Sequence, residues 1–429
     1  MTEKTYNTYL DILKHELQPA LGCTEPIAIA YAAAKARETL GDMPERMFVS
    51  CSGNIIKNVK GVIVPNAGGL RGIEVAATLG VVGGDPTRKL EALVNVTKDD
   101  IQRTRQLIAA GYCTCSLAEN VPALFIRIQV RKGEEEATVT IENSHTHIAS
   151  ITRNGETVFS SHQTVANAST EATPEQDPRQ QLTVARIIEF ADSMRVEDVR
   201  GILERQIDCN VAIAQEGLSN SYGIGVGKTL LKRYDASDVR IRARAKAAAG
   251  SDARMSGCPM PVVINSGSGN QGITVSLPVV EYAEELQSSK EELLRALAVA
   301  NLIAIHQKQY IGSLSAFCGA VCAATGAACG ISYLHGGRYE AISKTIIDTL
   351  ANVGGIVCDG AKPSCAAKIS SALDAAILGF EMGTEEGKAF NNGEGLVKQD
   401  VEATIRSFGR VGKDGMKTTD QEILHIMME

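Results

Sequence analysis

Tryptophan is absent from the 429-residue sequence, and aromatic residues account for only 4% of it. Glycine, with 40 residues, is abundant instead. Because glycine has no side chain, it lets helices and loops approach one another closely. The composition therefore favours a compact helical body whose pockets are lined by backbone.

Long apolar runs are also scarce. The N-terminal stretch MTEKTYNTYLDILKHEL contains acidic residues and no continuous apolar run, so it does not resemble a signal peptide. The least polar segment, residues 316–334, is mostly Ala, Gly, Cys, Ser and Thr, which indicates a buried helix rather than a membrane span. The formal net charge is -7 and the basic residues are scattered, which leaves no positive stripe for nucleic acid. We expect a cytoplasmic protein that binds neither membranes nor nucleic acid.

Several chemical motifs are missing as well. No CxxC pair and no HExxH motif occurs in the sequence, which argues against a structural zinc site, a thioredoxin-type dithiol and a zinc protease. The stretch GIGVGKT, residues 223–229, has Tyr222 where a phosphate-binding loop needs glycine. Its third glycine also comes one residue too early for a dinucleotide-binding fingerprint. We interpret this stretch as a turn at the start of a helix.

Hydrophobic periodicity predicts an α+β fold with a mainly helical body and a small α+β lobe. We assign residues 1–88, which contain the N-terminal helices and the SGNIIKN loop, to the helical body. Residues 89–165 form the predicted small lobe, and residues 183–429 return to the helical body. The intervening residues 166–182 are polar and include two prolines, which is typical of a linker.

Individual elements follow from the same patterns. The predicted helices cover residues 6–17, 25–40, 184–194, 196–214, 236–248, 313–334, 339–352 and 363–378. The predicted strands cover residues 47–51, 91–96, 123–130, 137–141, 147–151 and 261–265, with a hairpin turn at 153–155. Helix starts are indicated by Thr24 as an N-cap and by capping boxes that pair Thr97 with Asp100 and Ser289 with Glu292.

Eleven cysteines are scattered along the chain, which suits a reducing compartment better than a disulfide framework. Two of them stand in turns just before predicted helices, Cys23 in LGCTEP and Cys358 in IVCDGAKP. Because helix N-termini present free N–H groups and a positive dipole end, we expect both thiols to ionise easily. Cys365 falls inside the predicted helix, which indicates a packing role.

The stretch SAFCGAVCAATGAACG carries three more cysteines. On a helix that turns roughly 100° per residue, Cys318, Cys322 and Cys329 fall within about 40° of one another and share one stripe. Periodicity alone does not select a functional member, and a cysteine-rich core helix explains the pattern equally well.

Two tight polar loops, SGNIIKN at residues 52–58 and NSGSGNQG at residues 265–272, offer N–H groups, hydroxyls and carboxamides. Such loops can bind a small carboxylate in the way that backbone nests bind anions. Ordinary turns with capping side chains are an equal interpretation of each loop taken alone. The candidate binding groups are Ser52, Asn54, Lys57, Ser268, Asn270 and Gln271.

Taken together and in order, the motifs GCTEP, SGNIIKN, GSGNQG, SAFCGAVCAATG and CDGAKPSC resemble those of the L-cysteine desulfidases, which are related to the iron–sulfur L-serine dehydratase α chain. The resemblance extends over about residues 10–427, and GSGNQG together with CDGAKPSC makes it specific. It implies an iron–sulfur lyase that cleaves L-cysteine to hydrogen sulfide, ammonia and pyruvate by α,β-elimination, with the helical body as the catalytic body.

The resemblance also implies a 4Fe-4S cluster that is held by three cysteines and keeps one iron open. Carried over to this sequence, the ligands are Cys23, Cys318 and Cys358. An open iron can act as a Lewis acid for the substrate thiolate or carboxylate. Gly319 and Val321 stand where serine dehydratases tend to carry Gln and Glu, which argues against L-serine as the substrate.

In this interpretation the two polar loops hold the α-carboxylate of a small amino-acid substrate. The candidate proton-transfer residues are Lys57, Lys362 and His147, because a buried lysine or a histidine can act as a general base. Helices rich in small residues could continue into a homodimer interface. The alternatives are an L-serine dehydratase with the same cluster, a non-catalytic iron–sulfur sensor and a metal-free protein with buried thiols.

Overall fold

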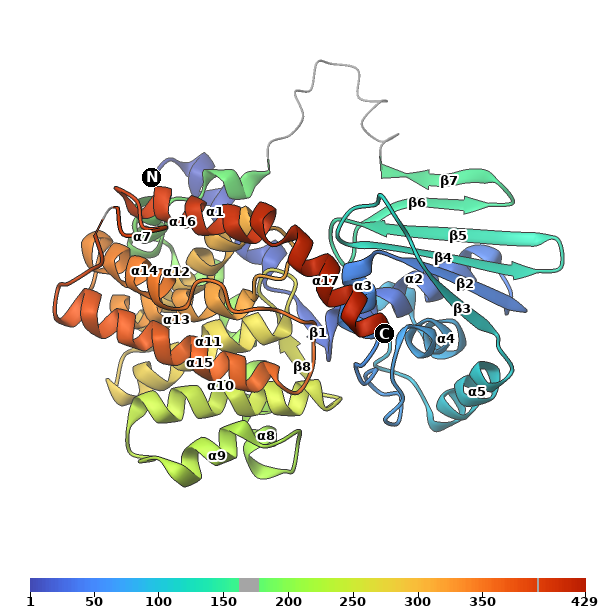
Figure 1. Cartoon of the computed structure of the whole chain (residues 1–429), viewed down its shortest axis with the longest axis horizontal. Coiled ribbons are helices and arrows are strands. Elements are labelled where there is room, and N and C mark those ends of the chain that lie inside the picture. The colour runs from blue at the N-terminus through green and yellow to red at the C-terminus, as the bar shows by residue number, and fades with distance from the viewer. Residues whose placement is uncertain (162–176, 392) are drawn as a thin grey trace, which may run out of the picture.

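A six-stranded sheet forms the centre of the smaller lobe, with strand order β3–β2–β4–β5–β6–β7 (Figure 1). The computed structural model describes residues 1–161, 177–391 and 393–429. β2 pairs in parallel with β3, and the other neighbouring strands of this sheet are antiparallel. The strands are β2 (Arg46–Cys51), β3 (Cys113–Leu117), β4 (Phe125–Lys132), β5 (Glu135–Glu142), β6 (Ile148–Arg153) and β7 (Glu156–Ser160).

One face of the sheet is apolar and packs on a helix. Ile126, Ile128 and Val130 of β4 are buried at every second position, which is the pattern of a strand with one covered face. Helix α2 (Thr24–Leu40) lies between this face and helix α4 (Ile73–Gly83). Because α2 is covered on both sides, its alanines and isoleucines are buried almost all round.

The helical body is built around α13 (Gly319–Leu334), which contacts α11, α12, α14 and α15 (Figure 1). Every residue of α13 from Ala320 to Tyr333 is buried, as expected for a helix without a polar face. The other helices of the body are α7 (Val184–Ser193), α8 (Val196–Ser219), α9 (Val226–Arg233), α10 (Val239–Met255), α11 (Gly269–Glu285), α12 (Lys290–Ile311), α14 (Tyr339–Val353), α15 (Cys365–Phe380) and α16 (Val401–Arg410).

Segments from both ends of the chain connect the two lobes. β1 (Pro19–Leu21) follows α1 (Glu3–Glu16) and pairs antiparallel with β8 (Pro261–Val263) of the body. At the other end, α17 (Lys417–Met428) runs from the body to α3 (Gly53–Val59) beside the sheet (Figure 1). The remaining short elements are α5 (Lys98–Ala109), η1 (Pro86–Glu91), η2 (Pro178–Gln181), η3 (Glu381–Glu385) and η4 (Val411–Gly415).

The predicted fold class, α+β with a mainly helical body, is confirmed. Both predicted capping boxes, Thr97 with Asp100 and Ser289 with Glu292, are present. No helix in the described part of the chain is long and apolar enough to cross a membrane.

The predicted domain boundaries stay a prediction. The strand order of the sheet bears on the predicted boundary between residues 88 and 89. β2 lies within the same sheet as the strands that follow residue 89, so the segment 46–51 shares the smaller lobe with them. Of the predicted linker 166–182, residues 166–176 lie outside the described residues. The described remainder contains the short helix η2.

The predicted strand at 91–96 is wrong. Residues 86–91 form η1 and the chain continues through turns, without a neighbouring strand. Leu90 and Leu93 are the buried apolar side chains of these turns. The Leu93 carbonyl accepts a hydrogen bond from the Asn66 side chain at 2.9 Å, so a side chain takes the place that a paired strand would fill.

The SGNIIKN loop is also different from the prediction, because most of it is helix α3. Ser52 is extended and precedes the first helical turn, and Ile55, Ile56 and Val59 are buried on one face of that helix. Apolar side chains spaced three and four residues apart thus stabilise a helix rather than a turn in this segment.

Three helix starts move relative to the prediction. The N-cap of α2 is Cys23 rather than Thr24, and α15 begins at Cys365 rather than Pro363. α13 begins at Gly319, and Cys318 is its extended N-cap residue. Cys318 therefore stands at the N-terminal end of the helix, and only Cys322 and Cys329 of the three cysteines lie within it.

Candidate functional site

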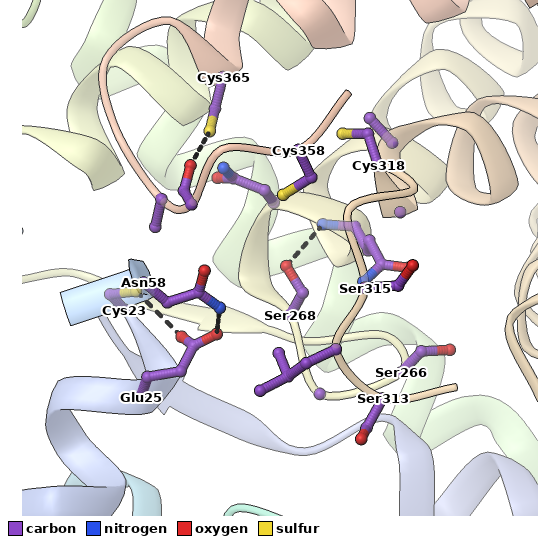
Figure 2. Close-up of a pocket in the computed structure, with 18 of the residues that line it drawn as sticks. Cys23, Glu25, Asn58, Ser266, Ser268, Ser313, Ser315, Cys318, Cys358 and Cys365 are labelled. Carbon is purple, nitrogen blue, oxygen red and sulfur yellow. Dashed lines mark hydrogen bonds between the residues drawn. The ribbon is translucent and has the colours of Figure 1, made fainter. Parts of the chain in front are cut away.

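A cavity of about 110 Å³ lies where the two lobes meet, several times the space that one water molecule needs. The smaller lobe, called the sheet lobe from here on, contributes α2, α3 and the turn before β6. The helical body contributes the loops that precede α11, α13 and α15. Figure 2 shows this site with its cysteines and serines labelled. Its lining side chains include Cys23, Glu25, Lys57, Asn58, His145, Arg254, Ser268, Asn270, Gln271, Lys308, Cys318, Cys358 and Cys365.

Cys318 and Cys358 are held next to each other by a short antiparallel bridge between Phe317 and Val357. The Cys318 N–H donates to the Ile356 carbonyl at 2.9 Å. A hydrogen bond from the Cys318 thiol lowers the pKa of Cys358, and it more than offsets the opposing effect of burial. The sequence predicted a lowered pKa for Cys358, and the direction is the same here. The main cause is the neighbouring Cys318 thiol and not the end of the helix.

The turn after Cys358 packs directly on helix α3. Gly360 has a φ of +97°, and a Cβ at this position would lie 2.5 Å from the Lys57 carbonyl oxygen, so only glycine fits. Asp359 forms ion pairs with Lys362 and Lys368. These contacts fix the CDGAK turn against the sheet lobe and leave Cys358 at the cavity.

Cys365 also lines the cavity, contrary to its predicted packing role. It is the first residue of α15, and its thiol lies 3.8 Å from the Gly360 carbonyl oxygen as a weak hydrogen-bond donor. Burial raises the pKa of the Cys365 thiol. Cys318, Cys358 and Cys365 therefore come from loop ends on the body side of the cavity (Figure 2).

Cys23 lies beside a buried carboxylate. Its thiol donates to Glu25 Oε2 at 3.2 Å, and Asn58 Nδ2 donates to Glu25 Oε1 at 3.0 Å (Figure 2). Burial raises the pKa of the Cys23 thiol, and the charge of Glu25 raises it further. The prediction that Cys23 ionises easily is therefore wrong, because burial and the carboxylate outweigh the helix end.

His145 completes this group. Its ring is buried against the backbone of Gly267, and Nε2 lies 3.9 Å from Glu25 Oε1 without a hydrogen-bond partner in the described residues. Burial alone would raise the pKa of the Glu25 carboxyl, but His145 and the Cys23 thiol hold that pKa below its ordinary value. Glu25 is thus an ionised carboxylate between a thiol and an imidazole.

Three basic side chains reach the cavity from different elements. Lys57 is buried and pairs with Asp420 of α17. Arg254 donates to the Gly22 carbonyl at 2.9 Å, and Lys308 donates to the Gly312 carbonyl at 2.6 Å. Within the described chain, neither Arg254 nor Lys308 forms an ion pair with a carboxylate. Burial lowers the pKa of Lys308, and the neighbouring thiols oppose that shift.

The loop before α11 forms one wall of the cavity. Ser268 caps the helix by accepting from the Gln271 N–H at 3.4 Å. The side-chain oxygens of Asn270 and Gln271 are buried without a hydrogen-bond partner in the described structure. Below the loop, Asn265 Nδ2 donates to Asn301 Oδ1 at 3.0 Å inside the body. The loop is thus held by a buried amide network and presents unpaired polar atoms.

The cavity brings together seven of the eleven side chains predicted from sequence, and four lie elsewhere. The Ser52 hydroxyl donates to the Ala123 carbonyl at 2.7 Å, and His147 is exposed with Nδ1 3.0 Å from the Glu142 carbonyl. Asn54 does not line the cavity, and Lys362 lines a neighbouring pocket instead. The seven that line it are Cys23, Lys57, Ser268, Asn270, Gln271, Cys318 and Cys358.

Sequence reasoning missed one acidic, one histidine and two basic side chains of the cavity: Glu25, His145, Arg254 and Lys308. Glu25 stands two residues after the cysteine of the GCTEP motif, so the motif contained a usable signal. His145 stands two residues before the histidine that was selected. Arg254 and Lys308 lie inside helices, and no local pattern separates them from solvent-facing basic residues.

The donor set fits an iron–sulfur cluster. Among the described residues, no three His, Cys, Asp or Glu side chains converge tightly enough to hold a single metal ion. A cluster of several irons is wider than one ion, so its thiolates stand farther apart. Four thiols line one cavity, two of them held next to each other by a backbone bridge, and they provide the soft ligands that such clusters prefer. The unpaired Arg254 and Lys308 would balance an anionic group, since buried unpaired charges are costly.

Comparison with known proteins agrees with the motifs. The sequence model of the serine dehydratase alpha chain matches residues 87–425. A UPF0597 protein of Lachnoclostridium phytofermentans is 52% identical over 423 residues, which cover 99% of this chain and 100% of the relative. A UPF0597 protein of Desulfitobacterium hafniense is 51% identical over 426 residues, which cover 99% of this chain and 97% of the relative. The match to the family extends over most of the chain, including the cavity loops before α11, α13 and α15, and the chain belongs to the serine dehydratase alpha chain family.

Proposed function

We propose that this protein is an iron–sulfur lyase that releases a β-substituent from a small L-amino acid, with L-cysteine as its substrate. The reaction cleaves L-cysteine to hydrogen sulfide, ammonia and pyruvate. The observation that carries the proposal is the pair Cys318 and Cys358, held by a backbone bridge at a buried cavity that two further thiols line. L-serine is the alternative substrate, since the same site suits loss of water.

Two sets of three thiols that include the pair Cys318 and Cys358 are available for a 4Fe-4S cluster. The set predicted from sequence is Cys23, Cys318 and Cys358, and the second set replaces Cys23 by Cys365. Cys365 lies at the end of the turn that begins with Cys358, and its thiol donates to the Gly360 carbonyl of that turn, whereas the Cys23 thiol donates a hydrogen bond to Glu25. These contacts favour Cys365 as the third ligand and leave Cys23 for proton transfer. When bound, a cluster with an open iron supplies a Lewis acid for the departing sulfur.

The remaining side chains suit binding and proton transfer. Arg254 and Lys308 are unpaired cations that would hold the α-carboxylate, and such anchoring fixes the Cα–H bond relative to the base. His145, with a free Nε2, and Cys23 flank the Glu25 carboxylate. In our proposal this group takes up the Cα proton and returns a proton to the leaving sulfide. The ion pair with Asp420 keeps Lys57 as a cation of the site rather than as its base.

The test is a comparison of cysteine variants prepared without oxygen. We expect Cys318→Ser to lose most iron and acid-labile sulfide and to lose sulfide release from L-cysteine. Cys329→Ser is the matched control, because Cys329 is buried within α13, the helix that Cys318 precedes, and does not line the cavity. Measuring pyruvate from L-cysteine and from L-serine separates the two substrates. Wild-type protein that binds iron but turns over neither amino acid would support a sensor instead.

The same preparation separates the two ligand sets. We expect Cys365→Ser to lose iron, and Cys23→Ser to keep iron while losing turnover. The reverse result would return Cys23 to the ligand set.

A further inference from the structure

The C-terminal helix α17 has no buried residue, yet one of its side chains reaches the site. Asp420 Oδ1 pairs with Lys57 Nζ, and Asp420 Oδ2 accepts a hydrogen bond from the Ala316 N–H at 3.0 Å. The side chain of Lys57 is only 2% exposed and that of Asp420 is 17% exposed. The carboxylate therefore joins the sheet lobe to the body at the edge of the cavity.

Ala316 belongs to the segment that holds the two adjacent thiols. Its carbonyl accepts a hydrogen bond from the Cys358 N–H at 2.7 Å. Two residues later, Cys318 donates to Ile356 across the same bridge. One Asp420 oxygen thus accepts a hydrogen bond from the backbone segment that fixes both thiols, while the other oxygen holds the Lys57 ammonium.

The rest of α17 docks through few contacts. A Cβ at Gly53 would lie 2.6 Å from Leu424 Cδ2, so the glycine of the SGN motif makes room for this leucine. Just before the helix, the Gly412 carbonyl accepts from the Ser315 hydroxyl at 2.7 Å. These contacts place α17 across the lobe junction (Figure 1). A helix with little buried apolar surface has low local stability, so its polar contacts matter for its position.

We propose that Asp420 is a positioning residue of the site, which aims the Lys57 ammonium into the cavity and fixes the segment from Ala316 to Cys318. It acts through these two partners and does not touch the substrate itself. The expected effect on turnover rests on the proposed function, whereas the effect on the Ala316 backbone does not.

The first test compares two variants that each remove one negative charge from α17. Asp420→Asn loses the ion pair with Lys57, and Glu422→Gln alters an exposed carboxylate whose ion-pair partner is His425 of the same helix. Loss of an outer contact of this kind typically costs about 10–100-fold in activity or metal affinity. We expect Asp420→Asn to lower kcat for sulfide release about 10–100-fold with KM within about twofold, and Glu422→Gln to match the wild type.

A double-mutant cycle separates positioning from a general loss of stability. If Asp420 acts through Lys57, Asp420→Asn should lower kcat little further once Lys57→Met is present. Leu424→Ala weakens the docking of α17 without changing a polar contact, so it should lower the melting temperature more than kcat. Independent, multiplying effects of the two polar variants, or a kcat for Asp420→Asn equal to the wild type, would overturn the proposal.

The second test uses metal-free protein and needs no enzymatic activity. Amide hydrogen exchange is measured for the peptide that contains Ala316 in wild type, Asp420→Ala and Glu422→Gln. Because Asp420→Ala removes the acceptor, we expect exchange at Ala316 to accelerate about tenfold or more. Unchanged exchange would refute the positioning role even if the enzyme is active. Faster exchange in a protein without iron or turnover would keep the role and refute the proposed function.

Discussion

Replacing Gly272 by alanine should impair the site more than the stability of the fold. Gly272 lies in the first turn of α11, and a Cβ at this position would stand 1.9 Å from the Val263 carbonyl oxygen of β8. The atoms nearest to the added Cβ belong to the backbone of Val263 and Ile264, so no side-chain rotation relieves the contact. Ordinary van der Waals contact begins at 3.4 Å, which requires the start of α11 to move by about 1.5 Å.

Two opposing contributions set the change in the free energy of unfolding of Gly272→Ala. Overpacking of this kind costs about 1–3 kcal/mol, and the better helix propensity of alanine returns about 1 kcal/mol. The net loss in the free energy of unfolding is therefore at most about 2 kcal/mol. The same displacement carries Ser268 and Gln271 with it, and a misplacement of about 1 Å can reduce catalysis about 100-fold.

Urea unfolding and kcat/KM for sulfide release check the two effects on one preparation. Gly201→Ala is the control, because Gly201 is an exposed helical residue, and a Cβ added there would meet no heavy atom within 4 Å apart from its chain neighbours and the nearby backbone of its own helix. We expect that control to gain up to about 1 kcal/mol and to keep full activity. A Gly272→Ala variant with wild-type kcat/KM would refute the close packing of α11 on β8 as the support of the site.

Two further predictions concern titratable groups. His145→Ala should lower kcat more than about 100-fold and His147→Ala less than about twofold, since only the former lines the cavity; equal losses would contradict the assignment of the base. Burial raises the pKa of Asp252 from 3.8 to about 6, so the wild type loses stability as pH rises from about 4 to 6 and stays lower above that range. Asp252→Asn should therefore be more stable than the wild type at pH 8, by about 3 kcal/mol at most, with a smaller gap at pH 5 in urea unfolding; a gap that does not depend on pH would contradict this reasoning.

Local sequence signals predicted most of the secondary structure. Capping boxes and apolar spacing placed α5, α12 and α14 because each signal lies within a few residues of the element that it marks. Where the prediction failed, a distant partner decided the outcome. The Asn66 side chain replaces a paired strand near Leu93, and β3 joins β2 although CTCSL carries no strong strand pattern.

For the candidate site, the sequence by itself determined which motifs matter, since glycines, cysteines and carboxamides at fixed spacings indicate tight turns and reactive side chains. Only the tertiary structure decided which of these side chains meet. It places Cys365 at the cavity instead of in the core, and His145 there instead of His147. It also brings Asp420 from the far end of the chain to the junction of the lobes. The physical reason is that helix and turn signals act over a few residues, whereas a cavity is formed by elements that are hundreds of residues apart and pack through their backbones.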